Sequence, residues 1–208
     1  MRYGYILPIL AAALLTGCFP RLASYSDGPA PGAPAQPAQP AAQPGPAANP
    51  PTIAETMPVE RVYAFIIVTN PYLTPAMARQ EAEAIVRHAG LRNVPVSLVV
   101  SLIATESSFN PRAVSPVGAQ GLGQLMPPTA KDMGVTDPFD IEQNIAGTTR
   151  YIAWLGQYWN KHPRKWEMAL ASYLAGVGTV SNQLKAGRDL TNEQAAYVKK
   201  ILHLTAKV

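Results

Sequence analysis

The sequence has almost no cysteine: Cys18 is the only one among its 208 residues. A single thiol excludes an intramolecular disulfide, a cysteine-based zinc site and a CxxC redox centre. Histidine is scarce too, and His88, His162 and His203 stand alone, without HExxH or any other metal-ligand spacing. The sequence therefore predicts no bound metal ion.

Charged residues are also few. They make up 14% of the chain, and the formal net charge is +4. Lys and Arg are scattered rather than gathered in a run with interleaved aromatic residues, so nucleic-acid binding is not expected. No GxSxG nucleophile motif is present, and the segment GAQGLG at residues 118–123 lacks the spacing and the preceding strand of a dinucleotide loop. We therefore expect no cofactor.

The N-terminus lacks an apolar run long enough for a transmembrane helix. Arg2 precedes an apolar segment from Ile6 to Leu15, whereas a span needs about 20 apolar residues. Small residues follow the segment and lead up to Cys18. This pattern is typical of an export signal, which we assign to residues 1–17.

The end of this signal, Leu15-Thr16-Gly17-Cys18, resembles the bacterial lipobox. The resemblance implies cleavage before Cys18 and a lipid anchor on that residue. Phe19 rather than Asp follows, as in lipoproteins sent to the outer membrane. We therefore expect an outer-membrane lipoprotein on the periplasmic face. The alternative is an ordinary secretory signal with a chance cysteine.

Residues 18–58 form a segment of different composition. From about Ser24 to Pro58 the chain consists mostly of Pro, Ala and Gln, with hardly a charged or large apolar residue. Such a segment cannot bury enough apolar surface to fold, and its prolines favour an extended conformation. It is predicted to be a disordered linker between the lipid anchor and a folded domain at residues 59–208.

The predicted domain is mainly α, because its apolar residues follow a helical period and show little alternation. Thr74-Pro75 and Pro95 mark helix starts, whereas Gly90 and Gly187 mark helix ends. Capping boxes are expected at Asp140 with Gln143 and at Thr191 with Gln194. Helices are expected at residues 59–69, 75–90, 95–106, after 127–128, 140–159, 164–174, 177–186 and 191–204.

Glu106 breaks the apolar pattern of the third helix. The series Val99, Leu102, Ile103 and Glu106 places its carboxylate on the apolar face. Partial desolvation and the negative end of the helix dipole both favour the protonated carboxyl, which a general acid near neutral pH requires. The alternative is a glutamate at a helix end that merely tilts out into water.

A series of motif residues begins at Glu106 and runs through the rest of the domain. It comprises Glu106-Ser107, Phe109-Asn110-Pro111, Ser115, Gly118-Ala119, Gly121-Leu122, Gln124, Met126-Pro127, Thr129-Ala130, Asp137-Pro138, Asn144-Ile145, Gly147, Tyr151-Ile152, Ala169-Leu170-Ala171, Tyr173, Ala175-Gly176, Tyr197-Val198 and Ile201. Together these resemble the catalytic domain of the soluble lytic transglycosylases, relatives of g-type lysozymes. The resemblance covers roughly residues 92–204 and implies a lysozyme-like helical domain with a catalytic cleft for peptidoglycan glycan strands.

The resemblance also implies a mechanism. Glu106 would protonate the oxygen between N-acetylmuramic acid and N-acetylglucosamine. It would then act as base while the sugar's own 6-hydroxyl closes into a 1,6-anhydro product. One carboxylate suffices because the substrate's N-acetyl group stabilises the developing positive charge. The acidic residues nearby are interpreted as surface, turn or cap residues: Asp132, Asp137, Asp140 and Glu142.

Six further residues are implied to bind substrate: Ser107, Ser115, Gln124, Met126, Tyr173 and Tyr197. Ser115, Gln124 and Met126 would line the sugar sites, because hydroxyl and amide groups hold the polar atoms of sugars. Tyr173 and Tyr197 would lie close to Glu106, where a tyrosine can orient a carboxylate by hydrogen bonding.

Two positions depart from the family pattern. Gly123 stands where the family usually has Met, and Leu174 stands where it usually has Asn. The departures would remove a large apolar wall residue and a polar contact near the cleft. They leave two alternatives to a lytic transglycosylase: a lysozyme-type hydrolase on the same fold, and a peptidoglycan-binding or assembly protein with weak or lost turnover.

Overall fold

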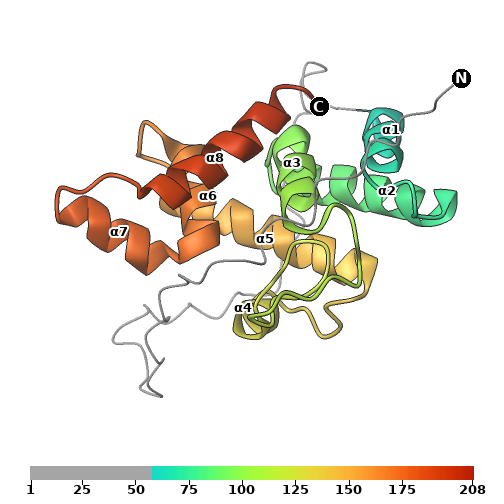
Figure 1. The fold of residues 1–208 in the computed structure, drawn as a ribbon, viewed down its shortest axis with the longest axis horizontal. Helices are drawn as coiled ribbons and strands as arrows, with labels where there is room; N and C mark the ends of the chain where they lie inside the picture. The colour runs from blue at the N-terminus through green and yellow to red at the C-terminus, as the bar shows by residue number, and fades with distance from the viewer. Residues whose placement is uncertain (1–57) are drawn as a thin grey trace, which may run out of the picture. The chain divides into compact units, whose positions relative to one another are not determined.

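The structure is a computed structural model that describes residues 58–208. The predicted signal peptide, the predicted lipidation site at Cys18 and nearly all of the predicted linker lie outside the described residues. Residues 58–208 contain no β-strand and eight helices, which Figure 1 shows in chain order. They are α1 (Val59–Thr69), α2 (Pro75–Leu91), α3 (Val96–Ser107), α4 (Pro127–Asp132), α5 (Ile141–Tyr158), α6 (Lys165–Ala175), α7 (Val177–Lys185) and α8 (Asn192–Thr205). The prediction of a mainly α domain is confirmed.

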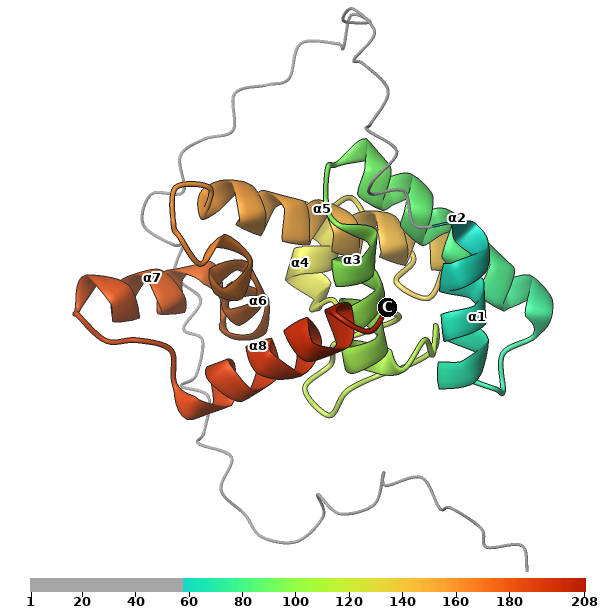
Figure 2. The ribbon, with the colours of Figure 1, turned by 90° about the horizontal axis from the view of Figure 1, so that it is seen from above.

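The long helix α5 organises the packing of this domain. It contacts α2 along one half and α6 along the other, and α8 crosses both α6 and α3 (Figure 1 and Figure 2). Ile145, Ile152 and Leu155 of α5 are fully buried in the core. None of the described helices has both the length and the apolar composition that crossing a membrane requires.

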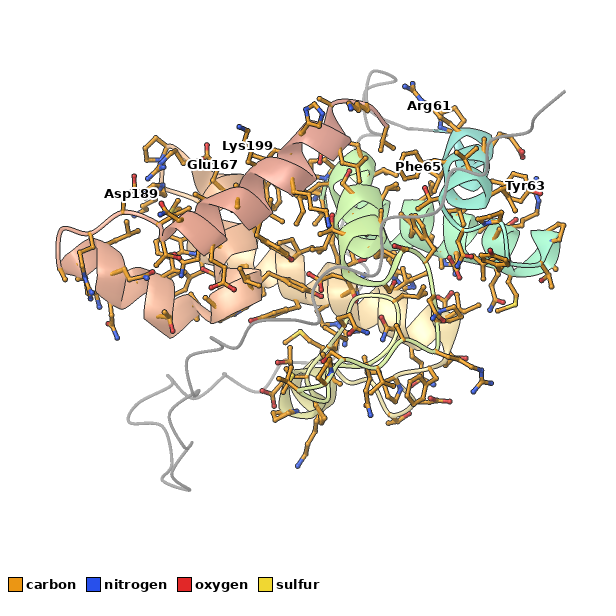
Figure 3. The ribbon with its side chains drawn as sticks, viewed as in Figure 1. Arg61, Tyr63, Phe65, Glu167, Asp189 and Lys199 are labelled. Atoms are coloured by element: carbon orange, nitrogen blue, oxygen red, sulfur yellow. The ribbon has the colours of Figure 1, made fainter. Side chains whose placement is uncertain are left out.

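Helix α1 covers the core and supports the chain that follows α3. Its Val62 and Ile66 are fully buried. Phe65 lies on the side of α1 that faces α3 (Figure 3), and its ring meets the edge of Phe109 at 6.2 Å. Directly after α1, the Asn70 side chain donates to the Phe109 carbonyl at 3.0 Å. The segment Val59–Thr69 is thus an integral part of the domain.

Two of the three helices with a predicted N-terminal capping residue have the capping hydrogen bonds that the sequence predicts. The Thr74 hydroxyl accepts from the Met77 amide at 3.2 Å, with Pro75 as the first helical residue. The capping box of Thr191 and Gln194 has both of its hydrogen bonds, at 3.3 and 2.9 Å.

The predicted capping box at Asp140 is only half correct. Asp140 accepts from the Gln143 amide at 2.8 Å. The Gln143 side chain does not return to Asp140, because its oxygen accepts instead from the Thr136 hydroxyl at 2.8 Å and from the amides of Thr136 and Asp137. The turn before α5 supplies these donors and competes successfully for the side chain.

Candidate active site

Helix α3 presents Glu106 at its C-terminal end. Val99, Leu102 and Ile103 of this helix are fully buried, and the predicted apolar face is therefore correct. Glu106 follows one turn later and is half-buried. Ser108 and Phe109 then take left-handed conformations, with φ of 50° and 57°. Two successive residues of this kind end the helix and turn the chain away immediately after Glu106.

The surroundings of Glu106 favour its protonated form. Burial raises the pKa of the Glu106 carboxyl, and a hydrogen bond from Tyr197 together with the charge of Lys200 lowers it only in part. The Tyr197 hydroxyl donates directly to Oε1 of Glu106. The site therefore provides what a general acid needs, which is a desolvated carboxyl with a donor ready to stabilise its ionised form.

Both tyrosines implied by the resemblance lie at this carboxyl. Burial and the nearby charge of Glu106 raise the pKa of Tyr197 and of Tyr173 well above 10, so both hydroxyls remain protonated donors. Tyr197 uses its hydroxyl on Glu106, whereas Tyr173 donates to the Gly123 carbonyl at 2.6 Å. Tyr173 thus shapes the loop beside Glu106 instead of bonding to the carboxylate.

The loop after α3 is held by side chains that the resemblance implies to bind substrate. Two isolated antiparallel bridges, Val114 to Gln120 and Gln120 to Leu125, fold it back on itself. The Ser115 hydroxyl accepts from the Ala119 amide at 3.0 Å. Gln124 has φ of 49°, and its side-chain nitrogen donates to two carbonyls of the loop, at 2.9 and 3.1 Å.

A pocket of about 190 Å³ lies beside this loop. It is lined by Gln124, Leu125, Met126, Thr129, Tyr151, Tyr173, Leu174 and Gly176. Three of the six expected substrate-binding residues therefore line the same pocket: Gln124, Met126 and Tyr173. Ser107 and Ser115 are not among the lining residues, and Ser107 donates to the Ile103 carbonyl at 3.3 Å.

Asn144 is a positioning residue to which sequence reasoning gave no role. It is almost fully buried on α5. Its oxygen accepts from the Gly123 amide at 2.8 Å, and its nitrogen donates to the carbonyls of Pro138 and Gln120 at 2.8 and 3.2 Å. Thr148, one turn further along α5, is also a polar residue at a buried position, and its hydroxyl donates to the Asn144 side chain at 3.3 Å. Polar residues at core positions of a helix are the sequence signal that could have indicated this role.

Thr148 also explains why residue 123 is glycine. A Cβ atom at Gly123 would lie 1.9 Å from the Thr148 hydroxyl oxygen and 2.8 Å from its Cβ. The loop therefore approaches α5 too closely for any side chain, and a methionine would not fit. The other departure, Leu174, is 41% exposed at the margin of the pocket.

The other acidic residues near this region are engaged elsewhere. Asp140 caps α5, and Asp137 accepts from the Phe139 amide at 2.9 Å. Glu142 pairs with His88 at 2.6 Å and with Arg87 at 2.5 Å, while Asp132 is exposed. Residues 58–208 contain no group of three or more His, Cys, Asp and Glu side chains arranged around a possible metal ion.

Fold and site together define a lysozyme-like helical domain whose candidate catalytic group is one desolvated carboxyl. The family description "Transglycosylase SLT domain" matches residues 83–195, and the chain belongs to this family. Its fold is similar to that of the 70 kDa soluble lytic transglycosylase from Escherichia coli, with a TM-score of 0.55 and 24% identity. That likeness covers 71% of this chain and 29% of the other.

Two curated relatives are similar in sequence over shorter stretches. The membrane-bound lytic murein transglycosylase F 2 of Alkalilimnicola ehrlichii is 37% identical over 101 residues, which is 47% of this chain and 22% of the relative. The transglycosylase of Enterobacteria phage PRD1 is 56% identical over 55 residues, 26% of this chain and 21% of the relative. The chain thus spans about a fifth of the length of these relatives.

Proposed function

We propose that this chain is a peptidoglycan lytic transglycosylase. It cleaves the β-1,4 bond between N-acetylmuramic acid and N-acetylglucosamine and leaves a 1,6-anhydro end. The main support is the half-buried carboxyl of Glu106. Its raised pKa and its hydrogen bond from Tyr197 suit a group that both gives and takes a proton. Membership of the family and relatives named lytic murein transglycosylases support the same activity.

The reaction needs one protein carboxyl. Protonated Glu106 gives its proton to the glycosidic oxygen as the bond from that oxygen to the anomeric carbon breaks. The carbonyl oxygen of the substrate's N-acetyl group stabilises the positive charge left on the sugar. The Glu106 carboxylate then takes the proton of the 6-hydroxyl as that oxygen bonds to the anomeric carbon. Glu106 ends protonated, and no water is consumed.

The remaining site residues have distinct roles in this proposal. Tyr197 orients Glu106 and stabilises its ionised form between the two proton transfers. Met126 and Gln124 line the sugar pocket, and Tyr173 fixes the loop carbonyl of Gly123 beside them. Ser107 and Ser115 each keep hydrogen-bonding capacity for a sugar. The Ser115 hydroxyl only accepts within the loop and can donate to the substrate, and the Ser107 hydroxyl only donates within α3 and can accept from it.

The masses of the products test this proposal against both alternatives. Wild type and Glu106→Gln are incubated with peptidoglycan sacculi, and the soluble products are analysed by mass spectrometry. We expect anhydro-muropeptides from the wild type and a rate about 10²- to 10⁴-fold lower in the variant, which has lost its general acid. Reducing-end products, one water heavier, would make the protein a hydrolase. Sacculus binding without any product would make it a binding protein.

We also propose that the domain is held at the periplasmic face of the outer membrane by a lipid on Cys18. The Leu15-Thr16-Gly17-Cys18 motif and the relatives named as membrane-bound support this location. Labelling with a fatty-acid analogue and membrane fractionation provide the test. Wild type should be labelled and sediment with outer membranes, whereas Cys18→Ala should lose the label. An unlabelled wild type, or a labelled variant, would refute the anchor.

A further inference from the structure

A row of aromatic side chains runs along one face of α5. Tyr151, Trp154 and Tyr158 are three and four residues apart, so they share a side of the helix. The Tyr151 and Trp154 rings are stacked, 6.2 Å apart at 12°, and the Trp154 and Tyr158 rings are 6.0 Å apart. Trp154 is 44% exposed and Tyr158 is 50% exposed. These exposed rings form a continuous apolar surface in contact with water. A surface of this kind is typical of a binding site.

The row is continuous with the pocket that Gln124, Met126 and Tyr173 line. Tyr151 lines that pocket, and its ring packs against Tyr173 at a centroid distance of 5.1 Å. Two of the other exposed apolar side chains of the domain, Met126 and Leu174, line the same pocket. The apolar surface therefore leads out of the proposed cleft and onto the exposed face of α5.

The outermost ring of the row, that of Tyr158, is held by contacts with α7 and with Trp159. The Tyr158 hydroxyl donates to the Ser181 hydroxyl on α7 at 3.3 Å. Its ring meets the edge of Trp159 at 5.0 Å, and Trp159 is in turn buried and bonded to Ser172 at 2.9 Å. A ring held on two sides loses little conformational freedom when a ligand covers it, which makes it a preorganised contact surface.

We propose that Trp154 and Tyr158 form a sugar-binding platform that extends the proposed cleft along α5. The ligand is the glycan strand itself, at pyranose rings remote from the bond that is cleaved; the inference therefore rests on the proposed function. Pyranose rings have apolar C–H faces, and these pack against the electron-rich faces of aromatic side chains. A narrow row of flat rings bordered by the exposed polar residues Arg150 and Gln157 fits a chain of sugar rings better than a broad protein interface.

The platform predicts a dependence on strand length. In the full chain with Glu106→Gln, which binds without cleaving, Trp154→Ala should weaken binding of long peptide-free glycan strands roughly three- to tenfold. Binding of a disaccharide, too short to extend from the cleft to Trp154, should not change. Trp154→Phe should retain most of the affinity. Tyr72→Ala is the matched control, because Tyr72 is an aromatic residue that is 94% exposed and lies outside the row.

Binding is measured by calorimetry, and thermal melting of each variant shows that it is folded. Equal affinity of Trp154→Ala and its parent for long strands, or no strand binding by the parent, would overturn the platform. Unchanged strand affinity together with anhydro products from the active protein would overturn only the platform. Strand binding that depends on Trp154, without products from the active protein, would keep the platform and overturn the proposed reaction.

Discussion

The Glu106 carboxyl must be protonated when it acts as acid and ionised when it acts as base. Burial raises its pKa and supplies the acid form, while the Tyr197 hydroxyl and the charge of Lys200 stabilise the carboxylate. Because the acid form starts the reaction, activity should decline as pH rises through the raised pKa of Glu106.

Replacing Tyr197 with Phe should change the pH profile as well as the rate. Loss of the donated hydrogen bond removes a contribution that lowers the pKa of Glu106, so the alkaline limb of kcat/KM should move to higher pH. Loss of a hydrogen bond to a charged group should also reduce the maximal rate, by about 10- to 100-fold. Rates on soluble glycan strands across pH provide the measurement. Tyr63→Phe on α1 is the control, and a limb that stayed fixed or moved to lower pH would contradict this role.

Glu81 is a second buried carboxyl, outside the proposed mechanism. It is fully buried on α2, and neither of its oxygens has a hydrogen-bond partner within residues 58–208. Burial raises the pKa of Glu81 from 4.5 to about 8. Between these values the folded state keeps the proton and the unfolded state releases it, so stability falls as pH rises through this window.

Glu81→Gln should therefore remove a pH dependence of stability. The wild type should lose about 3 kcal/mol of unfolding free energy between about pH 5 and pH 7.5, at about 1.4 kcal/mol per pH unit. The variant should lack this slope and be the more stable protein at pH 8. Urea unfolding at several pH values measures it, with the exposed Glu83→Gln on the same helix as control. A variant with the slope of the wild type would show that Glu81 does not cause it.

At the scale of helices, local sequence signals predicted most of the fold. Proline at Pro75, a capping box at Thr191 and glycine at Gly187 act through the adjacent backbone, so the sequence alone contains what they require. The Asp140 capping box was half wrong because amides of the preceding turn bind Gln143. That competition depends on how the turn folds, which the local motif does not contain.

The close contact of the cleft loop with α5 could not be predicted from the sequence. Gly123 and Thr148 come from different elements, and only the folded chain shows that the glycine has no room for a side chain. From the sequence, Gly123 was interpreted as the loss of a large apolar residue from the wall of the cleft. In the structure it is the condition that lets the loop reach Asn144 and Tyr173.

Gly123→Ala should destabilise the domain by about 1–3 kcal/mol, because the added methyl overlaps Thr148. Thr148→Ala in the same chain should recover part of this loss, since it removes the atoms at 1.9 and 2.7 Å and leaves the Cβ at 2.8 Å. Thermal melting of the single and double variants measures the coupling. Gly178→Ala is the control, with no atom within 4 Å of the added carbon. Strictly additive losses would contradict the contact.

At the scale of the whole domain, the site exists only because distant parts of the chain meet. Glu106 on α3 and Tyr197 on α8 are 91 residues apart, and their contact depends on α8 packing against α3. Periodicity alone singled out Glu106, because the glutamate lies in an apolar stripe. No spacing rule connects it with Tyr197 or Tyr173, and only the resemblance to the family predicted that they lie together.

The fate of water tests the proposed reaction most directly. The protein is incubated with peptidoglycan in water labelled with heavy oxygen, and the new glycan ends are analysed at once by mass spectrometry. Ring closure by the sugar's own hydroxyl predicts anhydro ends that carry no label, and Glu106→Gln should form almost none. Labelled reducing ends from the wild type would show that water completes the reaction and would contradict the account.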